Sequence, residues 1–367
     1  MSSIQRRGDR WYARYRDPEG RERARRFDRK VDAQRWIDEA TAAVVTGAYV
    51  DPRAGRVTLG DFYAEWSARQ VWASGTRTAA DLAVRLSGLA DTPLATLRRS
   101  HIETWVKAMT SRGLAPGTIA TRVNYVRSVL RAAVRDRVIA TDPSEGVALP
   151  RKRRADKAMT VPTAEQIGAL LTVADPGFAP GIALGAFAGL RIGEVCGVQV
   201  GDVAFLPRTL DVTRQVQRAR GGGCEVNPPK HGSERTVALP DALVTLLARH
   251  VGEPHDSGPG RWLFPGPDGG PIPYYTAGDR WRDARDAAGL PGLRFHDLRH
   301  FFASGLIAAG CDVVTVQRAL GHASATITLN TYAHLWPSAA DRTRSAAADL
   351  MSAALTTPAG ISRATEG

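Results

Sequence analysis

The sequence has 367 residues, too many for one typical domain and enough for two or three. With 49 basic against 37 acidic residues its formal net charge is +12, which predicts a polyanionic partner, although nucleic acid and an anionic membrane surface attract this charge equally. The first residues lack the apolar core of a secretion signal, and no apolar stretch approaches the roughly 20 residues of a membrane span. We therefore expect no membrane association and a cytoplasmic protein.

The three cysteines, Cys196, Cys224 and Cys311, are too widely spaced for a disulfide framework or a zinc motif. Free thiols in a reducing compartment are the expected state.

Residues 1–50 predict a small basic module. Alternation over 11–16, the extended run 21–27 and a shorter segment near 3–6 are separated by turn residues, and helical spacing follows from Val31. We predict a three-stranded sheet with a helix packed across one face, leaving arginines on the other. A sheet face can enter the DNA major groove, so DNA contacts are predicted for a set of arginines, with a solvated basic hairpin as the alternative: Arg14, Arg16, Arg21, Arg23 and Arg25.

Residues 58–148 predict an independent helical domain of four or five helices, after a linker over 48–56. Thr58 and Asp61 form a helix-start pattern, and 118–134 is a long amphipathic segment with Arg122 and Arg127 as predicted DNA contacts. A basic cluster in the following linker is predicted to touch DNA phosphate rather than to act as a nuclear signal: Arg151, Lys152, Arg153 and Arg154.

Residues 160–355 predict a third, mixed α/β domain, and 356–367 a C-terminal tail. The pattern 163–166 is a capping box, short strands are expected between Leu210 and Leu239, and four helical segments between about Tyr275 and Asp349. The predicted fold class is therefore mainly α with small β sections (α+β).

Four separated features in this third region share one possible chemistry. They are the segments 189–194 (GLRIGE), 229–237 (PKHGSERTV), 296–300 (HDLRH) and 320–322 (LGH), the last followed by Tyr332 ten residues after His322. His296 and Arg299 share a helix face if Asp297 opens that helix. Two planar, permanently charged guanidinium groups, Arg191 and Arg299, are suited to the non-bridging oxygens of one phosphate. Taken singly none of these residues is decisive, and the hypothesis depends on the ordered set.

That ordered set, Arg191, Lys230, His296, Arg299, His322 and Tyr332, resembles the active-site signature of the tyrosine recombinases, the phage integrase family. The family pattern covers about residues 160–350. The helical segment 58–147 is similar to the family's core-binding domain, and the N-terminal sheet and helix to its arm-binding domain.

The resemblance implies a mechanism. Tyr332 would attack the scissile phosphate and leave a 3′-phosphotyrosyl link with a free 5′-hydroxyl, so that no nucleotide cofactor and no metal is needed. His296 is the usual candidate base, Lys230 the general acid, and Arg191, Arg299 and His322 the phosphate ligands. Glu194 is expected to orient Arg191 or to cap a helix, and His300 to be structural, packed behind the site.

The expected function is site-specific recombination that integrates or excises a phage or mobile element, in a bacterial cytoplasm at the nucleoid. Expected partners are double-stranded DNA with core and arm sites, a homotetramer on that DNA, a host DNA-bending factor and an excisionase. The apolar residues of the last helical segment (Leu350, Met351, Leu355) either pack on a neighbouring subunit or belong to a frayed terminus. The alternatives are a Xer-like resolution recombinase, a type IB topoisomerase and a catalytically silent DNA-binding regulator.

Overall fold

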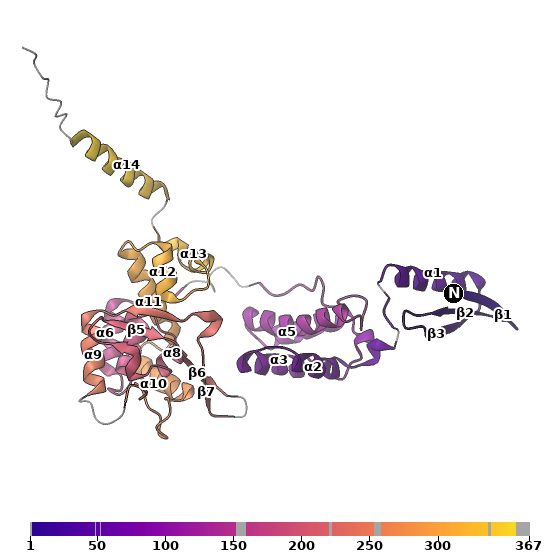
Figure 1. Ribbon diagram of the computed structural model, residues 1–367, viewed down its shortest axis with the longest axis horizontal. Coiled ribbons are helices and arrows are strands. Elements are labelled where there is room, and N and C mark those ends of the chain that lie inside the picture. The colour runs from indigo at the N-terminus through magenta and orange to yellow at the C-terminus, as the bar shows by residue number, and fades with distance from the viewer. Residues whose placement is uncertain are drawn as a thin grey trace, which may run out of the picture. The chain divides into compact units, whose positions relative to one another are not determined.

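The chain divides into two compact units, Met1–Ala158 and Met159–Gly367, in a computed structural model that describes residues 2–47, 49–51, 53–151, 159–219, 222–252, 258–336 and 339–356 (Figure 1). Helices dominate both units and the strands are short, which confirms the predicted fold class. No helix in these ranges is long and apolar enough to cross a membrane.

The first unit begins with an antiparallel sheet in the order β1-β2-β3, formed by β1 (Ser3–Arg7), β2 (Arg10–Arg16) and β3 (Glu22–Phe27). Helix α1 (Lys30–Val45) packs across β2 and β3, as Figure 1 shows. Ala13 of β2 is buried in a cluster with Ala33 and Ile37 of α1, and the buried Tyr15 ring packs on Trp36 at 5.0 Å. The alternating pattern therefore marks one buried face of the strand, as predicted. The N-terminal sheet and helix are thus confirmed.

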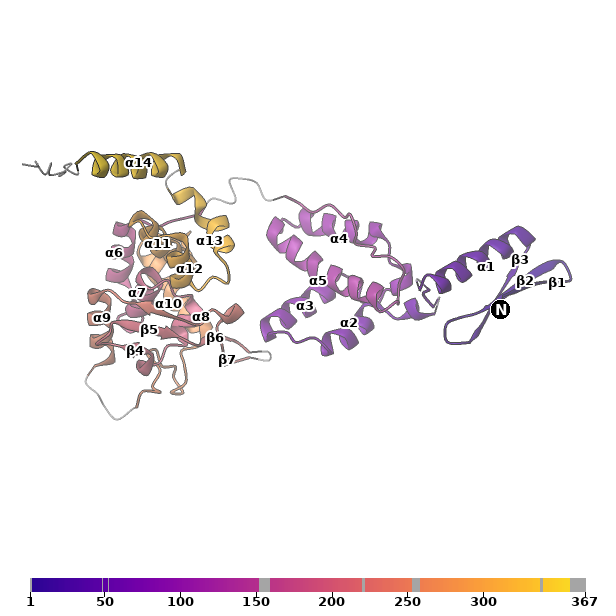
Figure 2. The ribbon, with the colours of Figure 1, turned by 45° about the horizontal axis from the view of Figure 1, so that its top comes forward.

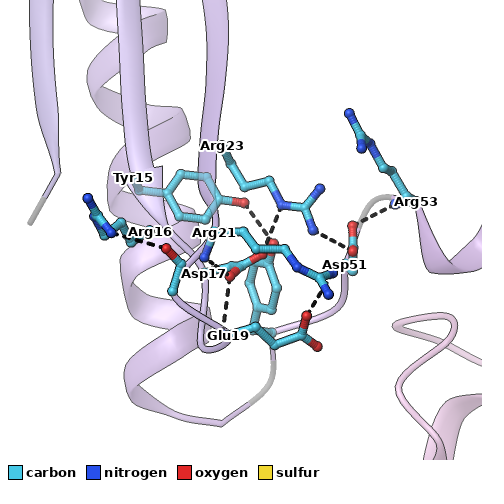
Figure 3. A network of polar contacts seen from close by, with 10 residues as sticks. Tyr15, Arg16, Asp17, Glu19, Arg21, Arg23, Asp51 and Arg53 are labelled. Carbon is cyan, nitrogen blue, oxygen red and sulfur yellow. Dashed lines mark hydrogen bonds and ion pairs between the residues drawn. The ribbon is translucent and has the colours of Figure 1, made fainter.

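An ion-pair network fastens the linker to this sheet (Figure 3). Arg23 Nε lies 2.9 Å from Asp17 Oδ2, and Arg23 Nη2 lies 2.5 Å from Asp51 Oδ2 in the linker. The Tyr15 hydroxyl donates to the Tyr49 hydroxyl at 3.2 Å. The Arg23 side chain is only 14% exposed, and both of its partners are acidic. The predicted DNA contact by Arg23 is therefore corrected: its charge is used inside the protein.

Four helices with their own apolar core follow in the first unit: α2 (Leu59–Ala68), α3 (Ser74–Leu86), α4 (Arg99–Ser111) and α5 (Pro116–Arg135), with the short 3-10 turns η1 (Ala54–Arg56) and η2 (Leu94–Thr96). Thr58 caps α2 as predicted, because its Oγ1 accepts from the Asp61 amide at 3.1 Å. Pro116 starts α5, where a missing N–H costs nothing. Helix α5 lies between α4 and the α2–α3 pair (Figure 2).

The second unit is built around α7 (Ala179–Phe187), which is buried on nearly every side. It packs against α6 (Ala164–Val173), α8 (Ile192–Cys196), α9 (Asp241–Val251) and α11 (Phe295–Ala308). The predicted capping box at the start of α6 is present, with the Thr163 amide donating to Gln166 Oε1 at 2.9 Å. The apolar stretch near Gly181 is thus the centre of a globular core.

The predicted strand section consists of two sheets. One has the order β4-β5-β8, formed by β4 (Val203–Ala204), β5 (Thr209–Val212) and β8 (Arg235–Ala238); the other is the hairpin of β6 (Gln215–Arg218) and β7 (Cys224–Asn227). Two 3-10 turns flank these strands, η4 (Val200–Asp202) and η5 (Lys230–Gly232).

The C-terminal part of the second unit has more helices than predicted. Instead of four segments, the structure has α10 (Tyr274–Ala287), α11, α12 (Val313–Leu320), α13 (Ala325–Tyr332) and α14 (Ala339–Thr356), with the 3-10 turn η6 (Ala333–Leu335). The prediction was wrong because α12 and α13 are only 8 residues each, and Gly321 separates them in a left-handed conformation. Helix α12 packs on α11 and α13 on α12 (Figure 1).

Candidate active site

Arg299 lies at the centre of the candidate site, on the second turn of α11. Its side chain is among the largest fully buried ones, with 1% exposed. Nη1 donates to the Gly189 carbonyl at 2.6 Å, and Nη2 donates to the Leu320 carbonyl. Helix α11 thereby joins the segment before α8 to the end of α12. The guanidinium is held by two backbone groups that come from distant parts of the sequence.

Two glycines make this arrangement possible. Gly189 has a φ of +67°, and a Cβ there would lie 2.5 Å from the Phe302 ring. Gly321 has a φ of +61°, and a Cβ there would lie 2.9 Å from the Ser233 carbonyl oxygen. A side chain at either position would be strained and would displace its neighbours. The glycines of the GLR and LGH segments therefore bring the Arg299 acceptors into place.

Glu194 joins two further arginines. Its Oε1 lies 2.6 Å from Arg191 Nη1, its Oε2 accepts from the Arg191 amide at 3.0 Å, and Arg235 Nη2 lies 2.9 Å from Oε2. Burial alone would raise the pKa of Glu194, but the charge and hydrogen bond of Arg235, followed by Arg191, hold it below its ordinary value. Glu194 both orients Arg191 and caps α8, as expected from the sequence. Arg191 is 31% exposed, so its guanidinium remains accessible.

Asp297 has a different position from the one predicted. Helix α11 begins at Phe295, and Asp297 is the third residue of its first turn, where it accepts from the Arg294 amide at 2.8 Å. His296 and Arg299 nevertheless belong to the same first two turns. His296 is exposed, whereas Arg299 is buried.

Tyr332 ends α13 and is 1% exposed. Its hydroxyl lies 2.8 Å from His300 Nδ1, and its ring stacks on that of His322, with 6.4 Å between centroids and 13° between planes. His322 Nδ1 lies 2.8 Å from Thr328 Oγ1. His300, expected to be structural and packed behind the site, is buried and also contacts the hydroxyl of the predicted nucleophile.

Lys230 begins η5 and is exposed, and its carbonyl accepts from the Ser233 amide at 3.3 Å. Within the described part of the chain, its side chain forms no hydrogen bond or ion pair with this cluster. The structure thus brings Arg191, Arg299, His322 and Tyr332 together, with His296 one turn before His300, whereas Lys230 lies on the turn that leads into β8.

The ionisable groups of the site have pKa values away from neutrality, and the arginines carry its positive charge. Burial raises the pKa of Tyr332 to about 12, against the lowering effect of Arg299 and Arg191. Burial, followed by the same two arginines, lowers the pKa of His322 to about 4. The pKa of His296 is also lowered, by burial and then by His300 and Arg299. At pH 7 these histidines are neutral hydrogen-bonding groups, and the arginines supply the charge.

The remaining predicted DNA contacts lie in different settings. Arg14 and Arg16 are on the sheet face away from α1, where Arg7 and Arg26 flank the Tyr12 ring at 5.4 and 5.0 Å. Arg21 is exposed, and Arg122 and the exposed Arg151 belong to the first unit. Arg25 was predicted on the face away from the helix, but it lies opposite Ala13 on the α1 side of the sheet, with its guanidinium 5.3 Å from the Phe27 ring. Arg127 is half-buried, and its Nη2 donates to the Ser144 carbonyl at 3.2 Å in the loop after α5; its DNA contact stays a prediction. Lys152 and Arg153 lie outside the described residues.

Two residues of the site were missed by the sequence analysis. Arg235 is only 5% exposed, and its Nε donates to the Ala319 carbonyl at 3.0 Å. Its position at the start of a strand, next to the lysine turn, was the available signal. His300 was noticed but given no contact with Tyr332. No group of three or more His, Cys, Asp or Glu in the described ranges could hold a metal ion.

Comparisons with known proteins find integrases and tyrosine recombinases. Residues 178–338 match the model of the phage integrase family. A putative prophage phiRv2 integrase of Mycobacterium tuberculosis is 26% identical over 330 residues, covering 86% of each chain. A tyrosine recombinase XerC of a Mycobacterium species is 28% identical over 269 residues, covering 66% of this chain and 80% of its own.

Solved structures show the same fold. The Tn1549 transposon integrase in complex with transposon right end DNA has a TM-score of 0.64 at 22% identity, covering 80% of this chain and 99% of its own. A lambda integrase tetramer bound to a Holliday junction has a TM-score of 0.58 at 18% identity, covering 91% and 97%.

The fold of the second unit, together with its clustered arginines, histidines and buried tyrosine, defines the class of enzymes that break and rejoin DNA strands. Residues 178–338 form a phage integrase family domain, and the protein is a tyrosine-type site-specific recombinase. The Xer-type alternative is less favoured.

Proposed function

We propose that this recombinase cuts and rejoins DNA through a covalent bond between Tyr332 and the 3′-phosphate of the broken strand. The observation that carries this proposal is the pair of oriented guanidinium groups beside the Tyr332 ring. Arg299 is fixed by two carbonyls and Arg191 by Glu194, so neither has to reorganise when a phosphate arrives. Because phosphoryl transfer builds negative charge on the non-bridging oxygens, fixed cations stabilise the transition state.

The other predicted residues complete the reaction. His322, neutral and held by Thr328, donates a hydrogen bond to the phosphate, and the exposed His296 contacts it from the open side. Lys230 is the general acid for the leaving 5′-oxygen. Its exposed position on the turn η5 suits a group that engages the substrate when DNA is bound. The phosphotyrosyl link conserves the energy of the phosphodiester, so no cofactor is needed.

The proposed biological reaction is integration or excision of a phage or mobile element. The alignment with the prophage integrase spans most of both chains, and the sheet-and-helix module at the N-terminus offers a second basic surface besides the catalytic unit. We assign arm-site binding to residues 1–50 and core-site binding to residues 58–148. Double-stranded DNA and a homotetramer assembled on it are the proposed partners, together with a host DNA-bending factor and an excisionase.

A covalent selection tests the proposal without knowledge of the attachment site. The protein is incubated with a pool of nicked duplexes of random sequence, and adducts that resist detergent are recovered and sequenced. We expect wild-type protein to enrich one sequence class, and Tyr332→Phe to bind the pool without forming an adduct. An adduct formed by Tyr332→Phe, or its absence with wild-type protein, would contradict the proposal.

A further inference from the structure

Three histidines surround Tyr332, but only one has a nitrogen at its hydroxyl. His300 Nδ1 lies 2.8 Å from Tyr332 Oη, whereas His322 Nδ1 is bound to Thr328 Oγ1 and stacks its ring on the face of Tyr332. Among the described residues no hydrogen bond joins His296 to Tyr332, and the His296 ring contacts that of His300 edge-on at 4.9 Å. The contact with the reacting oxygen therefore belongs to His300.

Burial makes this contact specific. His300 is 8% and Tyr332 1% exposed, and the two come from α11 and α13, 32 positions apart. A buried hydroxyl needs a partner, and within the described ranges His300 Nδ1 is the partner that Tyr332 has. In the tautomer of His300 that carries its proton on Nε2, the phenol donates and Nδ1 accepts, so that this nitrogen is in position to receive the proton.

We propose that His300 is the proton acceptor for Tyr332 during DNA cleavage. This inference rests on the proposed function and moves the role of base from His296 to His300. As Tyr332 Oη forms its bond to phosphorus, its proton passes to His300 Nδ1 and the P–O5′ bond breaks. The electron pair of that bond leaves with the 5′-oxygen, which takes a proton from Lys230. Rejoining runs the same transfers in reverse, with His300 returning the proton to the tyrosine oxygen.

The resting state keeps the proton on tyrosine. The pKa of Tyr332 is raised, and that of His300 is lowered by burial, with Arg294 and Arg299 outweighing Asp297. A bound phosphate adds negative charge beside these groups, which favours a protonated His300. The proton then moves only when a phosphate is present to be attacked, and the nucleophile is protected until DNA binds.

A pH dependence of the cleavage rate could also come from the other charged and titratable groups around His300. On its own helix these are Arg294, His296, Asp297 and Arg299, and from α13 the only one in contact is Tyr332, within the described residues. Arg299 and Arg294 do not titrate near neutrality. A kinetic pKa below the ordinary histidine value could come from His300 or from His296, and substitution of each histidine separates the two.

The test uses the nicked duplex recovered in the covalent selection and measures single-turnover cleavage. His300→Asn keeps an acceptor oxygen near Tyr332 Oη but cannot take up a proton. We expect its cleavage rate to fall by roughly 10²–10⁴-fold, the usual contribution of general base catalysis, with unchanged DNA affinity. The matched control is His334→Asn, an exposed histidine two residues after Tyr332, which should cleave at the wild-type rate.

Two readouts separate proton transfer from a purely structural role. The wild-type rate should fall as the pH drops through the lowered pKa of His300, and this fall should persist in His296→Asn but vanish in His300→Asn. A fluorinated tyrosine of lower pKa at position 332 should restore much of the rate lost in His300→Asn, because a more acidic phenol needs less help.

The outcomes are distinct. If wild-type protein forms no adduct, the proposed function fails and this inference with it. If wild-type protein cleaves but His300→Asn matches it, or loses rate without rescue by the acidic tyrosine, His300 is not the proton acceptor and the proposed function stands. Loss of the pH dependence in His296→Asn instead would return the role of base to His296.

Discussion

Removing the carboxylate of Glu194 should destabilise the catalytic unit more than any exposed ion pair can. Glu194 is 1% exposed and bonds Arg235, itself 5% exposed, at 2.9 Å as well as Arg191 at 2.6 Å. Glu194→Ala leaves a buried guanidinium without its counter-charge. Breaking a buried pair from one side costs roughly 3–5 kcal/mol. For a unit of this size that corresponds to a fall of roughly 10 °C in Tm.

Differential scanning calorimetry of the full chain provides the measurement, because the second unit should give its own transition. The control is Asp279→Ala, which breaks an exposed pair with Arg282 in the same unit and should cost under about 1 kcal/mol. The pKa of Glu194 is lowered in the folded state, so its contribution is present above the unfolded value of about 4.3 and is lost as the pH falls through the folded one. Equal shifts for the two variants, or a difference that grows toward low pH, would refute the argument.

Three further predictions concern the arm module and the nucleophile. Arg16→Gln, on the exposed sheet face, should reduce the slope of DNA affinity against salt by about one unit, whereas Arg23→Gln should leave that slope unchanged and loosen the 49–51 linker to proteolysis. Equal slopes for both variants would contradict this. In an alkaline ultraviolet titration, wild-type protein should show a tyrosine that ionises near pH 12 and is absent from Tyr332→Phe. If the ionisation lost in Tyr332→Phe instead occurs near pH 10, the Tyr332 hydroxyl is not buried. Deletion of residues 1–47 should abolish binding to distal arm sites and spare cleavage of the selected core duplex, and normal integration by the truncated protein would remove the arm assignment.

The candidate site could be predicted from sequence where local rules fix a residue's environment. The cap that Glu194 forms on α8, the capping box of α6 and the Thr58 cap of α2 are properties of short segments. The start of α11 was predicted only to within two residues, because the capping box makes Asp297 the third helical residue rather than the first. The buried face of the alternating β2 strand also followed directly from its pattern.

The contacts that escaped prediction join residues far apart in the chain. His300 meets Tyr332 because α13 returns to α11 by way of α12, and Arg235 meets Ala319 across 84 positions. Arg23 resembled its neighbours in a basic run until the linker brought Asp51 beside it. In each case the identity of the residue was visible in the sequence, and its partner depended on how separate elements pack.

Mapping the protein–DNA bond tests the central claim most directly. The adduct formed on the selected nicked duplex is digested with a protease and a nuclease, and the modified peptide is identified by mass spectrometry, while a kinase labels any free 5′-hydroxyl. We expect the nucleotide on Tyr332, attached through a 3′-phosphate, together with a labelled 5′-end. A nucleotide on another residue, or a link through a 5′-phosphate, would contradict the account.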